Sequence, residues 1–222
     1  MERLARAASA AGKASKDQMR KRISDIRRQE LAEATLLTLQ EYGFSGTTVQ
    51  RVSERAGMSH GLVHHYFKTK ADMIETAVRL TNARITAEVI RLLSQARTPR
   101  ERLAAVIEGN FAESVFNREI TQAWASCSGE AAFNEQFARI LRMIHRRLLS
   151  NLLWDLKKLL PVKEANLVAS GIAMMIDGAW LKCSLSSKPL SREKAMEPIW
   201  HYLDSHLPPE QPRRRSVRRA RN

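Results

Sequence analysis

Apolar positions recur at helical spacing along most of this 222-residue chain. Between residues 24 and 43 they follow the i, i+3, i+4, i+7 pattern of an amphipathic helix. The side chains expected to be buried on that helix are Leu31, Ala34, Thr35, Thr38, Leu39 and Tyr42. No alternating apolar run bounded by turn residues indicates a β-strand. The pattern therefore predicts an all-α protein.

Two short helices are predicted directly after the first. Gly43 stands where helices commonly end in a left-handed residue. Thr47 is predicted to begin the second helix, because Gln50 follows it at capping-box spacing, and Gly57 is predicted to end it. Ser59 is predicted to cap a third, very short helix. These three helices should form a compact head.

Longer helices are predicted for the rest of the chain, over residues 70–97, 100–116, 120–127, 130–160, 163–186 and 192–206. Four segments follow from these patterns and from composition. A mobile basic extension (1–22) precedes an N-terminal three-helix, helix-turn-helix domain (23–70). A larger helical domain (71–207) comes next, and a disordered Arg-rich tail (208–222) ends the chain, because its Pro-rich and Arg-rich sequence should not fold alone.

The net charge of +14 is concentrated at the two ends of the chain. Residues 1–70 hold 13 Lys or Arg against 7 Asp or Glu, and residues 208–222 hold 6 against 1. The middle, residues 71–207, holds 18 against 15 and is nearly balanced. A basic excess at both ends favours the attraction of a polyanion to these parts of the protein.

Cysteine content and hydropathy exclude several classes of protein. Cys127 and Cys183 are too few for a disulfide framework, and they lack the paired spacing of a zinc site. The most apolar stretch, residues 168–181, is interrupted by Asp177 and is too short to span a membrane. The N-terminus lacks the strong apolar segment of a signal peptide. We therefore expect a soluble cytoplasmic protein with no membrane partner, no metal and no cofactor.

The head has the order of a helix-turn-helix, with a helix, a tight turn containing Gly57 and a short second helix. One helix fits the major groove of DNA, which is about 12 Å wide, and its N-terminal side chains then reach base edges. Gly61 would let the backbone approach a phosphate without a Cβ in the way. His60 and His64 are one turn apart and are expected to share an exposed face.

The stretch TTVQRVSERAGMSHGLVHHYFKTK, residues 47–70, resembles the signature of the TetR family of transcriptional repressors. The landmarks of that signature are present as Thr48, Val52, Ser53, Ala56, Gly57, Ser59, Gly61, Tyr66, Phe67 and Lys70. The preceding ELAEATLLTLQEYGFSGTT, residues 30–48, is similar to the first helix of the family. The resemblance implies a helix-turn-helix DNA-binding domain followed by a larger domain for ligand binding and dimerisation.

The resemblance also implies roles for nine residues of the head. Three stand where the family usually faces bases: Gln50, His60 and His64. Six stand where it usually faces phosphates: Thr48, Ser59, Gly61, His65, Tyr66 and Lys70. Core packing is the alternative role for Tyr66. A metal site at His60 and His64 would lack a Cys, Asp or Glu ligand on the same face.

The C-terminal half resembles the choline-responsive repressors of glycine-betaine synthesis, the BetI subgroup of the same family. The similar stretches are GNF at 109–111, AW at 123–124, RRLLSNLL at 146–153, IDGAWLKCSLSSKPL at 176–190 and HYLDSHLP at 201–208. This resemblance implies a homodimer whose two heads address the half-sites of a pseudo-palindromic DNA operator.

The dimer seam is expected on helix 163–186, together with the last helix, as a four-helix arrangement. Small residues on that helix would allow close approach, at Ala169, Ser170, Ala173 and Gly178. They stand beside larger apolar residues at Leu167, Met174, Leu181 and Leu185. Packing inside the core of one subunit is the alternative.

A choline inducer would need aromatic faces around its quaternary ammonium, and a carboxylate could balance the charge. Asp177 and Trp180 are spaced i, i+3 and are expected to share one face of a helix. The other candidates are Phe111, Trp124 and Trp154, each with core packing as its alternative. After Ala-Trp the choline-responsive repressors continue with further aromatic residues, whereas this chain reads AWASCSGEA. A related cation or another small apolar ligand therefore stays open as the inducer.

Two other functions compete with that of a ligand-responsive repressor. An enzyme would need a catalytic motif, and the chain has neither a G-x-S-x-G elbow nor an H-E-x-x-H helix. A sequence-indifferent, architectural nucleic-acid-binding protein would need only phosphate contacts, which the arginine tail could supply. The ratio of affinities for operator and random DNA distinguishes a repressor from an architectural protein.

Overall fold

A computed structural model describes residues 2–188 and 190–208, with side chains from residue 17 onward. In this described part the regular elements are helices throughout, so the all-α prediction is confirmed. The helices are α1 (Glu2–Gly46), α2 (Val49–Ala56), α3 (His60–Tyr66), α4 (Lys70–Leu93), α5 (Pro99–Asn110), α6 (Arg118–Glu130), α7 (Glu135–Leu156), α8 (Val162–Leu185) and α9 (Arg192–His206). The predicted tail, apart from Pro208, lies outside the described residues.

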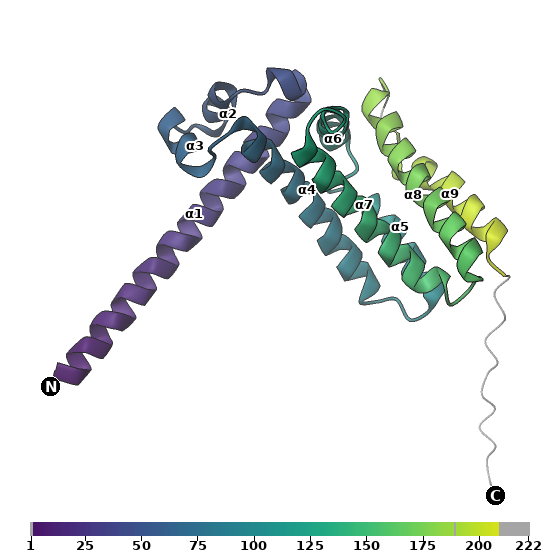
Figure 1. The fold of residues 1–222 in the computed structure, drawn as a ribbon, viewed down its shortest axis with the longest axis horizontal. Helices are drawn as coiled ribbons and strands as arrows, with labels where there is room; N and C mark the ends of the chain where they lie inside the picture. The colour runs from purple at the N-terminus through teal and green to yellow at the C-terminus, as the bar shows by residue number, and fades with distance from the viewer. Residues whose placement is uncertain (1, 189, 209–222) are drawn as a thin grey trace, which may run out of the picture.

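The first helix is much longer than its apolar periodicity predicts. It begins at Glu2, not near residue 24, and Figure 1 shows it projecting as a straight rod away from the rest of the chain. Alanine is frequent in residues 2–16 and is the strongest helix former, which explains the extra length without any packing. The residues buried on α1 start at Leu31, so the projecting part lies outside the packed head.

The junction between α1 and α2 differs from the predicted capping box. Gly43 has a φ of +64°, and the helix turns there. The Thr47 hydroxyl donates back to the Gly43 carbonyl at 2.7 Å, so it cannot cap the next helix. Thr48 is the N-cap instead, and its hydroxyl accepts from the Arg51 backbone N–H at 3.3 Å. Gln50 therefore has no capping role.

Tyr42 is not part of the buried face predicted for α1. The residue is 42% exposed, and the Arg51 guanidinium lies over its ring, 4.1 Å from the centroid. The buried apolar face ends at Leu39 because the chain bends at Gly43. Tyr42 therefore stays at the surface, where its ring makes a cation–π contact with an arginine. The other predicted positions on this helix are buried: Leu31, Ala34, Thr35, Thr38 and Leu39.

A small hydrophobic core holds the head together. Its buried side chains come from α1, α2, α3 with its C-cap, and the start of α4: Leu31, Ala34, Val52, Val63, Phe67 and Met73. The Ser59 hydroxyl caps α3, as predicted, and α4 begins at the predicted Lys70. Thr69 forms a full capping box with Asp72 there, which was not predicted. These caps fix where α3 and α4 begin.

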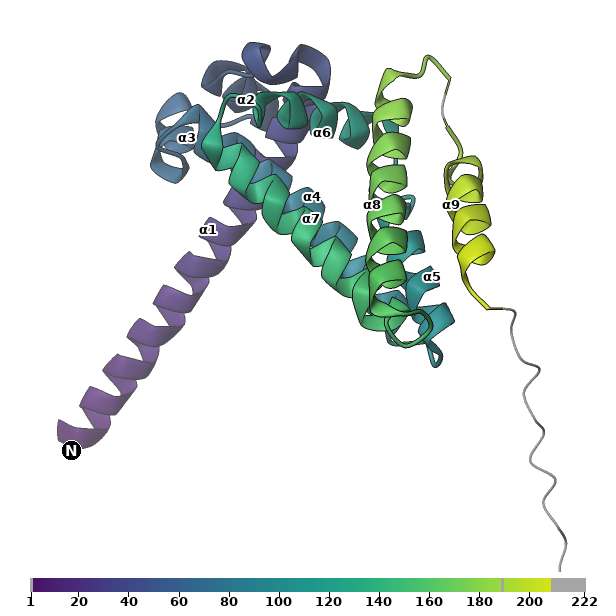
Figure 2. The same cartoon turned by 45° about the vertical axis from the view of Figure 1, so that its right-hand side comes forward.

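Helices α4 to α9 form the body, whose arrangement is seen in Figures 1 and 2. α4 and α7 run parallel and are joined by two polar contacts, one from Gln136 to Glu75 and one from the Arg147 Nη1 to the Thr86 hydroxyl at 2.5 Å. α8 and α9 stand side by side against the remaining helices (Figure 2). The body contains the larger core, centred on buried side chains such as Leu103, Phe137 and Ile172.

Most helix limits in the body differ from the predicted ones by one to six residues, and side-chain caps explain the starts of α5, α6 and α7. α5 begins at Pro99 because Thr98 forms a capping box with Glu101, and α7 begins at Glu135 because Asn134 caps it. α8 is long and apolar enough to cross a membrane. Nine of its side chains are buried in the body, so packing within the protein accounts for that composition.

Candidate DNA interface and ligand site

The recognition helix α3 is held by its apolar side. Val63 and Phe67 are buried in the head core, so the opposite side of this seven-residue helix faces outward. The Ser59 hydroxyl accepts from the Leu62 N–H at 3.3 Å and stabilises the first turn. Gly57 has a φ of +62°, the left-handed conformation that lets the chain reverse between α2 and α3.

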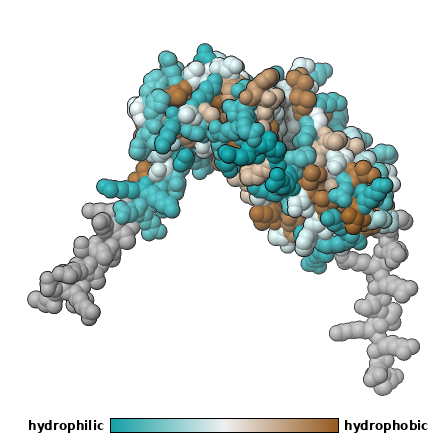
Figure 3. Space-filling model, viewed as in Figure 1, coloured by the Kyte–Doolittle hydropathy of each residue, from teal (hydrophilic) through white to brown (hydrophobic). Residues whose placement is uncertain are grey.

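The outward side of α3 carries the predicted contacts. His60, His64 and His65 are exposed, and His60 and His64 are one turn apart. A Cβ added at Gly61 would meet no atom of the protein within 4 Å. Packing inside the chain therefore does not require glycine at this position, and the backbone there is open to close approach from outside. Figure 3 shows the head as the more hydrophilic part of this face of the molecule.

Tyr66 has features of both roles considered for it, phosphate contact and core packing. Its side chain is half-buried and packs against the head core, and its ring meets His65 edge-on with centroids 5.3 Å apart. The start of α2 is open as well, since Thr48 and Gln50 are both exposed. Gln50 donates to Glu54 at 3.0 Å, one turn along the same helix. The structure thus brings α3 and the first turn of α2 to the surface of one small domain.

Lys70 is more restrained than its sequence position suggests. Its ammonium donates to the Ser45 carbonyl at 3.0 Å and lies 4.9 Å from the centre of the Phe44 ring. Burial lowers the pKa of Lys70, and the charge of Glu130 opposes this shift. Two other basic side chains near α3 were not predicted as part of the site: Lys68, which is exposed, and Arg28, which lies over the Phe67 ring.

Four aromatic side chains meet in the body, where a ligand site was predicted. Trp180 contacts Trp124 and Phe116 edge-on, with ring centroids 5.9 and 6.1 Å apart. Phe116 also meets Phe111 at 4.9 Å. The Trp180 indole N–H donates to the Asn110 carbonyl at 3.1 Å, which fixes its orientation. Phe116 was not predicted, although the adjacent Val115 and its own large apolar ring were signals for burial. We call these four residues the aromatic cluster.

Asp177 does not belong to the aromatic cluster, so its predicted shared face with Trp180 is wrong. Trp180 is 4% exposed, whereas the Asp177 side chain is 60% exposed. Ile176 and Trp180, four residues apart, lie on the buried stripe of α8, and Asp177 is turned about 100° further round the helix. Its carboxylate lies 3.8 Å from His145 Nδ1 on α7. Partial loss of water around the exposed carboxyl, caused by the neighbouring helices, raises the pKa of Asp177, and the charge of His145 opposes the shift.

Trp154 lies apart from the other tryptophans in the candidate set. It is 66% exposed near the end of α7, and the Lys158 ammonium lies 5.1 Å from its ring centroid. Among the described residues there is also no group of three or more His, Cys, Asp or Glu side chains that could hold a metal ion. The functional features of the described chain are therefore an exposed helix-turn-helix surface and apolar or aromatic sites in the helical body.

Comparison with protein families divides the chain in the same way. The family described as bacterial regulatory proteins, tetR family, matches residues 31–77. The family described as BetI-type transcriptional repressor, C-terminal, matches residues 99–208. The curated regulator BetI of Yersinia pestis is 34% identical over 187 residues, which cover 83% of this chain and 94% of that protein. BetI of Klebsiella pneumoniae is 33% identical over 188 residues, covering 84% and 96%.

Solved structures have the same fold. A TetR transcription regulator from Haloarcula marismortui superposes with a TM-score of 0.72 at 21% identity, covering 83% of this chain and all of that one. A transcriptional regulator from Saccharomonospora viridis, solved in complex with choline, has a TM-score of 0.71 at 15% identity, with 81% and 96% covered. These families contain transcriptional regulators and not enzymes. The chain therefore belongs to the TetR family of helix-turn-helix transcriptional regulators and has a C-terminal domain of the BetI type.

Proposed function

We propose that this repressor acts in the cytoplasm as a homodimer that places α3 of each subunit in successive major grooves of a pseudo-palindromic operator. The observation that carries this proposal is the exposed first turn of α3, held by two buried anchors. In this arrangement base edges face Gln50, His60 and His64. Phosphates face the remaining predicted residues, Thr48, Ser59, Gly61, His65, Tyr66 and Lys70.

The dimer seam is proposed on the outer face of α8. Four large apolar side chains are exposed there at spacings of seven and four residues, namely Leu167, Met174, Leu181 and Leu185. Exposed apolar stripes of this length are unusual on a protein that stays monomeric. The small residues Ala169 and Ala173, which were expected to line the seam, are buried inside the subunit. The proposed seam is therefore made by the larger residues, with Gly178 between them.

The inducer proposed for this repressor is choline or a related small quaternary ammonium, and its target genes are those of choline and glycine-betaine metabolism. Support comes from the BetI-type C-terminal domain and from the choline complex of the regulator of similar fold. The aromatic cluster brings together four rings, the type of side chain that binds such a cation. Because Asp177 points elsewhere, the cation would be held by rings alone within this cluster.

A route from the aromatic cluster to the head is present in α6. This helix carries Trp124, and it packs along α1 of the head. An ideal Cβ at Gly43, where α1 turns, would lie 4.0 Å from the Ser126 hydroxyl. A ligand that moves Trp124 would therefore shift α6 against that turn and change the angle of the head. Such a ligand releases DNA only if it binds better to the non-binding arrangement.

Footprinting upstream of the gene that encodes the protein, with and without choline, tests the proposal. We expect a protected pseudo-palindrome that choline exposes. His64→Ala should weaken operator binding about tenfold, as one lost base contact does, whereas His201→Ala on α9 should leave it unchanged. Protection that choline does not alter would remove the inducer and leave the repressor.

A salt titration on operator and random DNA separates a repressor from an architectural protein. Equal affinities on both duplexes would favour the architectural alternative. We expect deletion of residues 209–222, with their six arginines, to weaken both affinities by similar factors and to preserve their ratio. A loss confined to the operator would contradict a sequence-independent role for the tail.

A further inference from the structure

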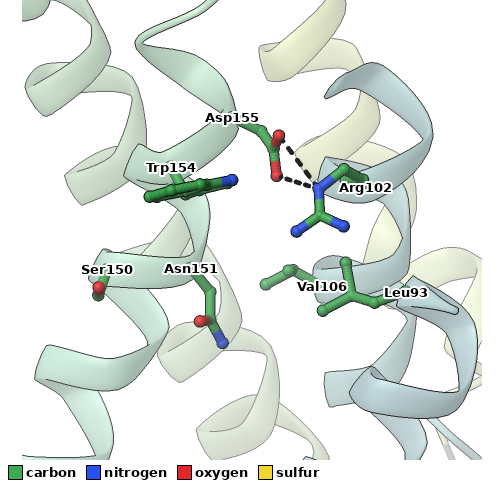
Figure 4. Close-up of a pocket in the computed structure, with 7 residues that line it drawn as sticks. All are labelled: Leu93, Arg102, Val106, Ser150, Asn151, Trp154 and Asp155. Carbon is green, nitrogen blue, oxygen red and sulfur yellow. Dashed lines mark hydrogen bonds and ion pairs between the residues drawn. The ribbon is translucent and has the colours of Figure 1, made fainter. Parts of the chain in front are cut away.

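A cavity of about 210 Å³ lies between α5 and α7, at the end of α4 that is remote from the head. Figure 4 shows the side chains that line it: Leu93, Arg102, Val106, Ser150, Asn151, Trp154 and Asp155. None of them belongs to the aromatic cluster. Pockets for drug-sized molecules start at about 300 Å³, so this cavity suits a smaller ligand.

Arg102 is fixed in place by a buried carboxylate at the edge of the cavity. Its Nε donates to both oxygens of Asp155, at 3.2 and 2.9 Å, as Figure 4 shows. Asp155 is only 1% exposed and also accepts from the Lys158 ammonium at 2.7 Å. The guanidinium therefore has a defined orientation before any ligand arrives, which lowers the entropic cost of binding.

The two terminal nitrogens of Arg102 are the available donors of the site. Figure 4 shows them directed into the space between Asn151 on one side and Val106 on the other. Among the described residues, the hydrogen bonds of this guanidinium are those of its Nε. Two terminal N–H groups on one planar fork match the two oxygens of a carboxylate. Arg102 and Lys158 together outweigh the single charge of Asp155, so the site attracts an anion.

The other side chains that line the cavity indicate which group could be attached to the bound anion. Leu93 and Val106 give an apolar wall, and the indole of Trp154 lies across from Arg102 (Figure 4). Asn151 adds an amide that can donate a further hydrogen bond. An inorganic anion would leave the apolar walls in contact with water. We propose that this cavity binds a small organic carboxylate, with its charged end on Arg102 and its apolar body against Trp154.

The proposal does not depend on choline as the inducer, because it concerns different residues. Isothermal titration of the full-length protein with benzoate tests it, at constant ionic strength set with NaCl. Benzamide, the uncharged counterpart, and sulfate, an anion without an apolar body, serve as ligand controls. We expect benzoate to bind and both controls to bind at least about tenfold more weakly, since each lacks one half of the recognition.

Matched arginine variants locate the site. Arg102→Lys keeps the charge but loses the fork, and should weaken benzoate about tenfold or more. Arg100→Lys changes a neighbouring arginine that pairs with Asp204 instead, and should leave benzoate affinity unchanged. Circular dichroism checks that both variants fold.

A second variant decides the question if Arg102→Lys fails to fold. Asn151→Asp places a negative charge in the cavity at a position without a hydrogen bond among the described residues, and it should abolish benzoate binding while the fold is kept. Three outcomes would overturn the proposal: no heat from benzoate, equal binding of benzamide or sulfate, or benzoate binding that survives Asn151→Asp.

Discussion

Ser59 and Thr98 cap helices in different parts of the molecule. Alanine variants at the two positions distinguish an effect on stability from an effect on DNA binding. Each hydroxyl accepts from a backbone N–H three residues ahead, Ser59 at the start of α3 and Thr98 at the start of α5. Replacing either by Ala should lower the free energy of unfolding by about 1 kcal/mol, measured in urea. Only Ser59→Ala should also weaken operator binding, since α3 is the helix proposed to enter the groove. Equal losses of DNA affinity would argue against that placement of α3.

Asp155 and Asp204 offer a second residue-scale comparison. Asp155 is buried between Arg102 and Lys158, whereas Asp204 pairs with Arg100 at the surface, 3.4 Å away. Asp155→Asn should lower the free energy of unfolding by about 2 kcal/mol, because it leaves a partly buried guanidinium without its counter-charge. Asp204→Asn should cost less than about 0.5 kcal/mol. Similar losses in the two urea titrations would show that burial of Asp155 contributes little.

Single residues also show how far the sequence could predict the site. The outward placement of His60 and His64 followed from one-turn spacing and was correct. The burial of Trp180 and the exposure of Asp177 could not be predicted from i, i+3 spacing, because that spacing leaves about 60° between two side chains. Which of two such neighbours faces the core depends on the helices packed around α8. Those contacts join residues far apart in the chain.

At the scale of helices, a pH-dependent contact joins α4 to α7. Burial alone would raise the pKa of Glu75, but hydrogen bonds from Gln136 and Arg79 and the charges of Arg79 and Arg139 hold it below its usual value of 4.5. Ionised Glu75 therefore stabilises the native state above pH 4.5, and this contribution is lost as the pH falls through the lowered pKa.

Glu75→Gln should accordingly be less stable than the native chain at neutral pH. The two proteins should converge in stability once the pH falls below the lowered pKa of Glu75, where the carboxyl of the native chain is protonated as well. Urea titrations over this range measure the difference. A gap between the two free energies that stays constant with pH would show that ionisation of Glu75 is not its cause.

Helix order and type were predictable, whereas helix limits were not always. Periodicity gave α9 with its observed bounds and α4 with its observed start at Lys70, and the predicted cap Ser59 marked the start of α3. The start of α1 was missed because residues 2–16 have helix-forming composition without an apolar stripe, and periodicity detects only the stripe. The start of α2 was missed because adjacent threonines compete for the cap, and only the bend at Gly43 decides between them.

For the whole molecule, the proposed seam on the outer face of α8 is what would let two heads act together. Leu181→Glu would place a charge in this seam and should convert the proposed dimer to a monomer in light-scattering measurements, with at least about a tenfold loss of operator affinity. Ile90→Glu changes an equally exposed apolar residue on α4, away from that face, and should leave the mass unchanged. Monomers from both variants, or from neither, would argue against α8 as the seam.

The contacts between α4 and α7 restrict how the body can move. Two contacts fix the alignment of the helices: Glu75 with Gln136, and Thr86 with Arg147. The partners in each contact are 61 positions apart in the sequence, so both contacts belong to the same alignment of α7 along α4. Translation of α7 along α4 would break both contacts together. Rotation of the two helices as one rigid body would break neither. A displacement of the C-terminal end of α7 would therefore rotate α4 and α7 together and would not shift one helix along the other. The head would receive this motion as a rotation.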